Sequence, residues 1–142
     1  MDEPCVFCEV VAGRAPARIV WEDDATLALV DLRQAHPGHV LVLPRRHLSD
    51  VRELDQDLSG QLMWTVVRVT RAVGEVFANE GLSLWHSIGP AAFQEIPHLH
   101  VHIHPRKRDD GLLRVYPNAP VGADAALLDQ VGTRLRRILS PT

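Results

Sequence analysis

Four histidines alternate with apolar residues late in the chain, as His98, His100, His102 and His104. In a β-strand successive side chains point to opposite faces, so these imidazoles would share one face and the apolar residues between them the other. Neighbours on one face lie about 7 Å apart, which lets one imidazole meet a substrate while the next ones position it. A merely solvated strand face is the alternative, but Thr, Lys or Glu would serve that purpose as well. The row therefore predicts a functional site.

Two kinds of chemistry can use such a row. Neutral imidazoles at every second position can hold a catalytic zinc or iron ion, which would make His98, His100 and His102 the ligands of a metal-dependent hydrolase. Alternatively, one imidazole can act as a nucleophile toward phosphorus. The spacing alone does not distinguish the two.

The two cysteines, Cys5 and Cys8, are too few for a disulfide framework. Their close spacing in a chain without a recognisable targeting segment indicates metal or redox chemistry. Tetrahedral zinc needs four ligands, so two more would have to come from elsewhere in the chain. A thioredoxin-like role would need the pair at the start of a helix in a βαβ unit, which the predicted elements do not offer. A dithiol without metal is the remaining alternative.

The composition limits the class of protein. With 142 residues, 46% of them apolar and 23% charged, the chain has the size and balance of one globular domain. Eighteen acidic against fifteen basic residues give a formal charge of -3, which provides no broad positive field for a nucleic-acid polymer. No apolar run exceeds four residues and the first residues are acidic. We therefore expect neither a membrane span nor a secretory signal, and a cytoplasmic location.

The apolar pattern predicts the elements that position these side chains. We expect an α+β fold, in which one long helix crosses an antiparallel meander sheet of about five strands and a further helix lies near the C-terminus. Residues 1–111 would form the main domain, with residues 112–142 as a C-terminal loop and helix packed on the same domain. Turn-forming residues separate the strands, and apolar stripes with three-and-four spacing mark the helices. The expected strands cover residues 18–21, 27–31, 40–43, 82–88 and 98–103, and the expected helices cover residues 57–79 and 124–139.

Two blocks resemble the hallmarks of the histidine triad (HIT) family of nucleotide hydrolases and transferases. Residues 94–106 read Gln-Glu-Ile-Pro-His-Leu-His-Val-His-Ile-His-Pro-Arg, with three histidines alternating with apolar residues. Residues 31–47 contain Pro-Gly-His at the expected start of a strand. The pair Cys5 and Cys8 is similar to that of the family's zinc-carrying bacterial members. The resemblance covers about residues 5–111.

The flanks of the histidine row fix its register within this resemblance. Family members have Gln four residues before the first triad histidine and Pro-Arg shortly after the third. Gln94 and the Pro-Arg pair therefore select His98, His100 and His102 and leave His104 as an extra. The resemblance implies that the middle histidine, His100, is the nucleophile and becomes transiently nucleotidylated.

Further roles follow from the same resemblance. It implies that His39 and His102 steer the phosphates, that Asp31 holds the ribose hydroxyls, and that Gln94 contacts the leaving-group side. Ser87 stands where the family usually has Asn, and its shorter polar side chain would contact phosphate. The implied catalytic residues are His100, His98, His102 and His39; the implied nucleotide-binding residues are Asp31, Ser87, Gln94, His39 and His102; and the implied zinc ligands are Cys5, Cys8, His47 and His98.

The implied substrate is a small purine nucleoside conjugate, of dinucleoside polyphosphate or nucleoside phosphoramidate type, from which a mononucleotide is released. The resemblance also implies a structural zinc ion, no catalytic cofactor and a homodimer. The chain departs from the family where Phe93 replaces Gly and where Glu95 replaces Ser or Thr. Because an acid repels phosphate, Glu95 predicts a leaving group that bears a cation or an amine. The competing hypothesis is a non-enzymatic, zinc-stabilised nucleotide-binding module.

Overall fold

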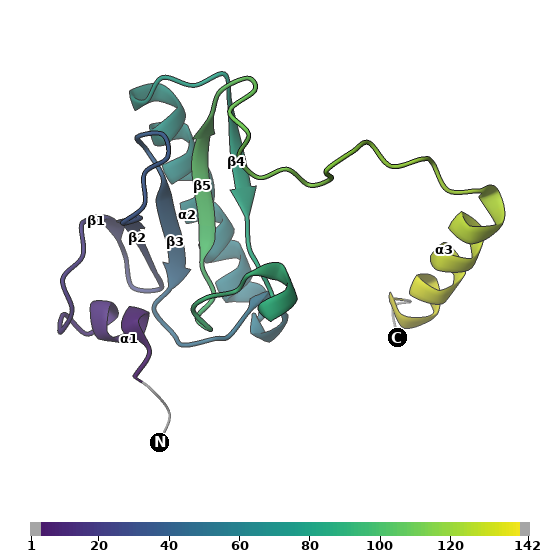
Figure 1. The fold of residues 1–142 in the computed structure, drawn as a ribbon. Coiled ribbons are helices and arrows are strands. Elements are labelled where there is room, and N and C mark those ends of the chain that lie inside the picture. Colours follow the sequence, from purple (N-terminus) through teal and green to yellow (C-terminus); the bar gives the residue numbers. More distant parts are fainter. Residues whose placement is uncertain (1–3, 140–142) are drawn as a thin grey trace. The chain divides into compact units, whose positions relative to one another are not determined.

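A five-stranded antiparallel sheet organises the structure, a computed structural model that describes residues 4–139 (Figure 1). The strand order is β1-β2-β3-β5-β4, so the first three strands form the predicted meander and β5 lies between β3 and β4. The predicted α+β class and the five strands are confirmed. The strands are β1 (Ile19–Glu22), β2 (Thr26–Val30), β3 (Val40–Pro44), β4 (Gly81–Trp85) and β5 (Val101–Arg106).

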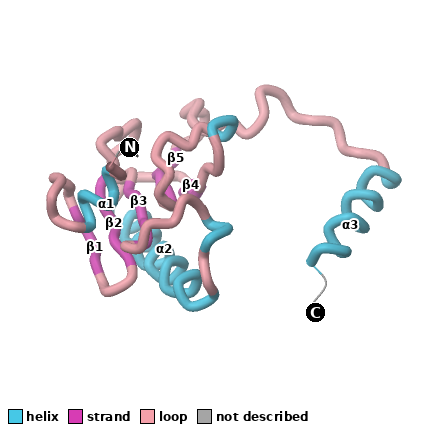
Figure 2. Tube along the Cα trace, turned by 90° about the horizontal axis from the view of Figure 1, so that it is seen from below, coloured by secondary structure: helices cyan, strands magenta, loops and turns pink. Residues whose placement is uncertain are grey.

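The long helix α2 (Gln56–Val76) covers one face of the sheet (Figures 1 and 2). Asp55 caps its first turn by accepting a hydrogen bond from the amide of Leu58. The predicted apolar stripe is buried from Leu58 to Val73, whereas Val76, which we expected to be its last member, is exposed. The helix ends at Val76, three residues before the expected end, because Phe77 is in an extended conformation. The buried apolar core between α2 and the sheet contains Leu58, Leu62, Val66, Val69 and Val73 from the helix and Ala28, Val40, Val42, Leu99 and Ile103 from the sheet side.

A short helix that the sequence pattern did not predict, α1 (Val6–Val11), packs against other side chains of the same strands. Successive residues of β3 belong to alternate cores: Val40 and Val42 pack with α2, whereas Leu41 and Leu43 pack with Phe7 and Val10. The sheet is thus covered on both faces, which explains why β2 and β3 are apolar at nearly every position.

The histidine row enters the sheet later than expected. Strand β5 begins at Val101, whereas the prediction began at residue 98. The amide of Leu99 donates to the carbonyl of Leu48, in a loop, so this part of the row makes no sheet ladder. The predicted alternation nevertheless holds, since Leu99 and Ile103 lie in the α2 core while the histidines contact residues on the other side. Strand β4 likewise ends at Trp85 rather than at residue 88.

Gly38 is required by a close approach just before His39. Its φ is +116°, and a Cβ atom added there would lie 2.7 Å from Cδ2 of Phe77 and 2.8 Å from Cγ of Pro105. A larger residue would meet both the strained backbone conformation and the two rings. The end of α2 and β5 therefore both limit the turn that delivers His39.

The residues from Gly111 onward form a second compact unit, separate from the unit that ends at Asp110. Its helix α3 (Ala125–Leu139) begins within one residue of the predicted start and carries the expected apolar stripe. The predicted packing of residues 112–142 on the main domain stays a prediction. In the described part of the chain, none of the helices combines the length and the apolar character needed to cross a membrane.

Candidate active site

The tautomer of His100 follows from its surroundings. Its Nδ1 lies 2.6 Å from the main-chain carbonyl oxygen of His98. A carbonyl oxygen only accepts hydrogen bonds, so Nδ1 carries the proton and Nε2 carries a free lone pair. Burial lowers the pKa of His100. The bond to this carbonyl and the negative charges of Asp31 and Glu95 oppose the effect only in part. The ring is therefore neutral near pH 7 and presents a nucleophilic nitrogen.

A chain of hydrogen bonds fixes the two predicted phosphate-steering histidines. His39 Nδ1 donates to the carbonyl of Arg33 at 3.1 Å, which leaves its Nε2 as an acceptor. His102 Nδ1 lies 2.9 Å from that Nε2 and therefore donates to it. The remaining nitrogen of His102, Nε2, keeps a lone pair. Burial lowers the pKa of His102 to about 3, and the repulsion that His100 and His39 would exert in their protonated forms adds to this effect.

Asp31 lies at the far end of this chain and is buried. Its Oδ2 lies 3.7 Å from His39 Nε2, and its Oδ1 accepts the amide hydrogen of Arg33 at 2.7 Å. The structure thus brings together Asp31, His39 and His102, which are far apart in the sequence.

Trp85 is a part of the site that the sequence interpretation missed. Its ring stacks on His102, with ring centroids 4.3 Å apart and planes inclined by 2°. Trp85 and His102 are direct cross-strand partners of β4 and β5, so the register of that strand pair would have revealed the contact. The stack restricts rotation of the His102 ring.

Gln94 and Ser87 have surroundings different from those of the histidines. The Gln94 amide nitrogen donates to the carbonyl of Ser49 at 2.9 Å, and its oxygen accepts from the amide of Gly89 at 2.9 Å. Gln94 thus fixes the loop before the row. Ser87 is half-buried just beyond β4, and within residues 4–139 its side chain makes no hydrogen bond. Their predicted contacts with substrate stay predictions.

An apolar cavity of about 260 Å³ opens beside Asp31. Apolar side chains from α1, β2, β3 and the loop before the row form most of its wall, while Asp31 and Arg33 provide polar groups. Such a pocket suits a flat ring attached to a hydroxylated group. Its apolar lining includes Phe7, Val10, Leu29, Leu41 and Ile96.

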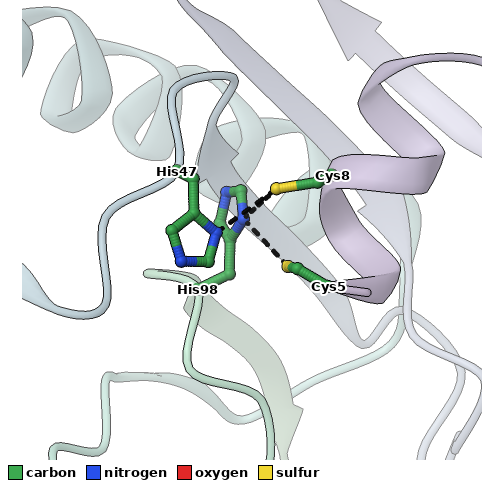
Figure 3. A group of neighbouring side chains, drawn as sticks. All are labelled: Cys5, Cys8, His47 and His98. Carbon is green, nitrogen blue, oxygen red and sulfur yellow. Dashed lines mark hydrogen bonds between the residues drawn. The ribbon is translucent and has the colours of Figure 1, made fainter. Parts of the chain in front are cut away.

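The predicted zinc ligands Cys5, Cys8, His47 and His98 form one cluster (Figure 3). The distance from His98 Nδ1 is 3.4 Å to Cys5 Sγ and 3.6 Å to Cys8 Sγ, and His47 Nδ1 lies 3.3 Å from Cys8 Sγ. Ordinary zinc–sulfur and zinc–nitrogen bond lengths at a tetrahedral angle place S and N about 3.6 Å apart. The cluster therefore fits a four-coordinate metal.

The protonation of His98 suits this cluster as well. Its Nε2 donates to the carbonyl of Pro44 at 2.8 Å, so the Nδ1 that faces the thiols has the lone pair a metal requires. The orientation is incompatible with the alternative in which the three triad histidines share one ion, because Nδ1 of His98 faces Cys5 and Cys8 while Nδ1 of His100 is bound to a carbonyl.

Comparisons with known proteins agree with this geometry. Residues 12–109 match the model of the HIT domain. The protein hit of Bacillus subtilis (strain 168) is 38% identical over 104 residues, which are 73% of this chain and 72% of the relative. Adenosine 5'-monophosphoramidase hnt1 of Schizosaccharomyces pombe is 28% identical over 135 residues, 93% of this chain and 98% of the relative. The crystal structure of a HIT-family member from Bacillus subtilis has a TM-score of 0.90 and 31% identity, covering 99% of this chain and 100% of that one.

Proposed function

The chain belongs to the HIT domain family, and from that premise we propose that it is a nucleotide hydrolase or transferase that acts on the α-phosphate of purine nucleoside conjugates. The observation that carries the proposal is the fixed tautomer of His100, whose Nε2 is unprotonated and whose Nδ1–H is held by a carbonyl. The same arrangement would serve a metal-free attack on phosphorus. The S. pombe relative is named as an adenosine 5'-monophosphoramidase, which supports a small adenylyl substrate.

The proposed reaction has two steps. In the first, the Nε2 lone pair of His100 attacks the α-phosphorus, a P–N bond forms, and the bond from phosphorus to the leaving oxygen or nitrogen breaks. The leaving group departs with that electron pair and takes a proton. In the second step a water oxygen attacks phosphorus, the P–N electron pair returns to Nε2, and the water releases a proton. The product is a mononucleotide, and His100 is restored as the neutral ring.

The neighbouring groups support both steps. Trp85 and His39 fix the His102 ring. A negatively charged phosphate bound beside its Nε2 would raise the pKa of this ring, so that Nε2 would take up a proton and donate it in a hydrogen bond to a phosphoryl oxygen. The charge developing on phosphorus would be stabilised by these preorganised imidazoles. We assign the ribose hydroxyls to Asp31 and the purine ring to the apolar cavity beside it.

We also propose that Cys5, Cys8, His47 and His98 hold a structural zinc ion. A zinc ion bound there would cross-link α1 to the histidine row and would supply no reaction chemistry. The homodimer stays a prediction from the family resemblance, and the cytoplasmic location stays a prediction from the composition and the acidic first residues. An outer edge of the sheet is formed by β4, which is consistent with strand pairing between two copies.

Covalent labelling tests the proposed reaction. The protein is incubated with an adenylyl conjugate labelled in its α-phosphate, such as diadenosine triphosphate or adenosine 5'-phosphoramidate, and is then quenched in alkali or in acid. We expect an acid-labile, alkali-stable adduct on His100 that is absent from the H100A variant. Nucleotide binding without any adduct or turnover would favour the non-enzymatic module. Turnover retained by H100A would refute the proposal.

A further inference from the structure

An ion pair joins the two loops that carry the proposed nucleotide-binding residues. Arg33 Nη2 lies 2.6 Å from Glu95 Oε2, and Arg33 Nη1 lies 3.3 Å from Glu95 Oε1. Arg33 follows Asp31 by two residues, and Glu95 directly follows Gln94. The pair therefore spans the site from the proposed ribose side to the proposed leaving-group side.

The main chain of Arg33 is bonded to two residues of the site. Its amide donates to Asp31 Oδ1 at 2.7 Å, and its carbonyl accepts from His39 Nδ1 at 3.1 Å. Arg33 also lines the apolar cavity in which we place the purine. A substrate held at Nε2 of His100 would therefore lie close to this ion pair.

The ion pair is exposed, so Arg33 can exchange the Glu95 carboxylate for another anion. Its side chains are 74% and 63% exposed, and ion pairs this exposed contribute little to stability. The planar guanidinium that grips a carboxylate through two N–H groups matches a phosphate equally well. Since Arg33 neutralises Glu95, the repulsion expected from the sequence between Glu95 and substrate phosphate is reduced.

We propose that Glu95 occupies Arg33 as a carboxylate stand-in for phosphate, and that substrates whose leaving group begins with a phosphate displace it. Arg33 then binds the first phosphate of the leaving group and selects polyphosphate conjugates over amine conjugates. Arg33 and Glu95 are thus specificity-determining residues with opposite effects. This inference rests on the function proposed above.

The opposite effects separate this role from a purely structural one. For diadenosine triphosphate we expect Arg33→Met to raise KM about tenfold, the effect of losing one charge-assisted contact. We expect Glu95→Gln to lower that KM several-fold, because Arg33 loses its internal competitor. Methionine keeps the apolar stem with which residue 33 lines the cavity. With adenosine 5'-phosphoramidate, which has no phosphate in its leaving group, we therefore expect the KM of each variant to stay within about twofold of wild type. The matched control is Arg46→Met, which removes another exposed ion pair, the one with Asp55, whose side chains are 54% and 55% exposed.

Two results would overturn the inference. If the pair only clamps the loops, the Arg33 and Glu95 variants would shift KM in the same direction for both substrates. A second measurement, calorimetric binding of AMP and ADP to the H100A variant, needs no turnover. There, adding Arg33→Met should weaken ADP binding about tenfold and leave AMP binding nearly unchanged. If H100A binds AMP, and adding Arg33→Met leaves its preference for ADP over AMP unchanged, this inference alone is refuted. If H100A binds no AMP at all, the proposed function is refuted with it.

Discussion

Replacing Gly38 by alanine tests how strictly the structure constrains the turn before His39. The backbone there has φ +116°, and holding a non-glycine residue in such a region costs about 1–3 kcal/mol. The new Cβ would also lie 2.7–2.8 Å from ring atoms of Phe77 and Pro105, and overpacking of this kind costs about 1–3 kcal/mol. We expect a loss of about 3–4 kcal/mol, a large part of the 5–15 kcal/mol typical of a domain.

Two other glycines provide matched controls. Gly13 also has a positive φ, +73°, but an added Cβ would have no atom within 4 Å. Gly13→Ala therefore reports the backbone term alone, about 1 kcal/mol. Gly60 lies within α2, also with no atom within 4 Å, so Gly60→Ala should stabilise by about 0.5–1 kcal/mol. Urea unfolding at a fixed zinc concentration measures all three.

The order of the free energies of unfolding of the three variants tests whether contacts with Phe77 and Pro105 constrain the turn. If Gly38→Ala loses no more stability than Gly13→Ala, the contacts with Phe77 and Pro105 do not constrain the turn, and the reasoning is wrong. A large loss for Gly38→Ala together with a gain for Gly60→Ala would support it. Because Gly38 precedes His39, a folded Gly38→Ala protein should also lose activity.

Three further changes test other parts of the site. Burial lowers the pKa of His102 in the folded state from 6.5 to about 3, so the folded protein disfavours the protonated ring. The free energy of unfolding should therefore be highest above pH 6.5 and fall as the pH drops toward 3, by about 2 kcal/mol at pH 5 from this ring alone. Equal free energies of urea unfolding at pH 7 and pH 5 would contradict this prediction. Cys8→Ser should weaken cobalt binding, reduce the thiolate charge-transfer band per bound cobalt ion to that of the one remaining thiolate, Cys5, and lower the melting temperature of the zinc-loaded protein by several degrees. Unchanged metal affinity would exclude the proposed ligand set. Trp85→Leu should lower the free energy of unfolding by about 1 kcal/mol more than the loss of buried apolar area explains, and should reduce kcat. Trp85→Phe should retain most of the stability and most of kcat. Leu and Phe variants with the same stability and kcat would show that stacking on His102 is unimportant.

Helix α2 could be predicted because its apolar residues recur every three to four positions. Strands β2 and β3 could be predicted because they are short, nearly continuous apolar runs bounded by turn-forming residues. Helix α1 escaped prediction because it has only six residues, too few to show a helical period, and because its buried Phe7 and Val10 are defined by contact with β2 and β3. The late start of β5 has a similar cause. The segment at His98 is fixed by bonds to Pro44 and Leu48, which no local pattern reveals.

Within the site, the sequence predicted which residue types gather but not how they are oriented. The row, its register and the four-residue metal cluster followed from spacing and resemblance. The tautomers depend on which main-chain carbonyl oxygen each ring meets: that of His98 for His100, and that of the distant Pro44 for His98. The Arg33–Glu95 pair joins residues 62 positions apart. The position of Phe93 has a backbone φ of +61°, which explains why family members usually have glycine there. The sequence alone does not reveal this conformation.

The bond that orients His100 ends on the main chain of residue 98, not on its side chain. Any amino acid at that position would offer the same carbonyl oxygen, whereas the proposed metal site needs a side chain there that can bind the ion together with the thiols. Proteins of this architecture could therefore lack the proposed metal site, cysteines included, and still keep the attacking Nε2 unprotonated and Nδ1 protonated. The two properties share one residue but are free to diverge.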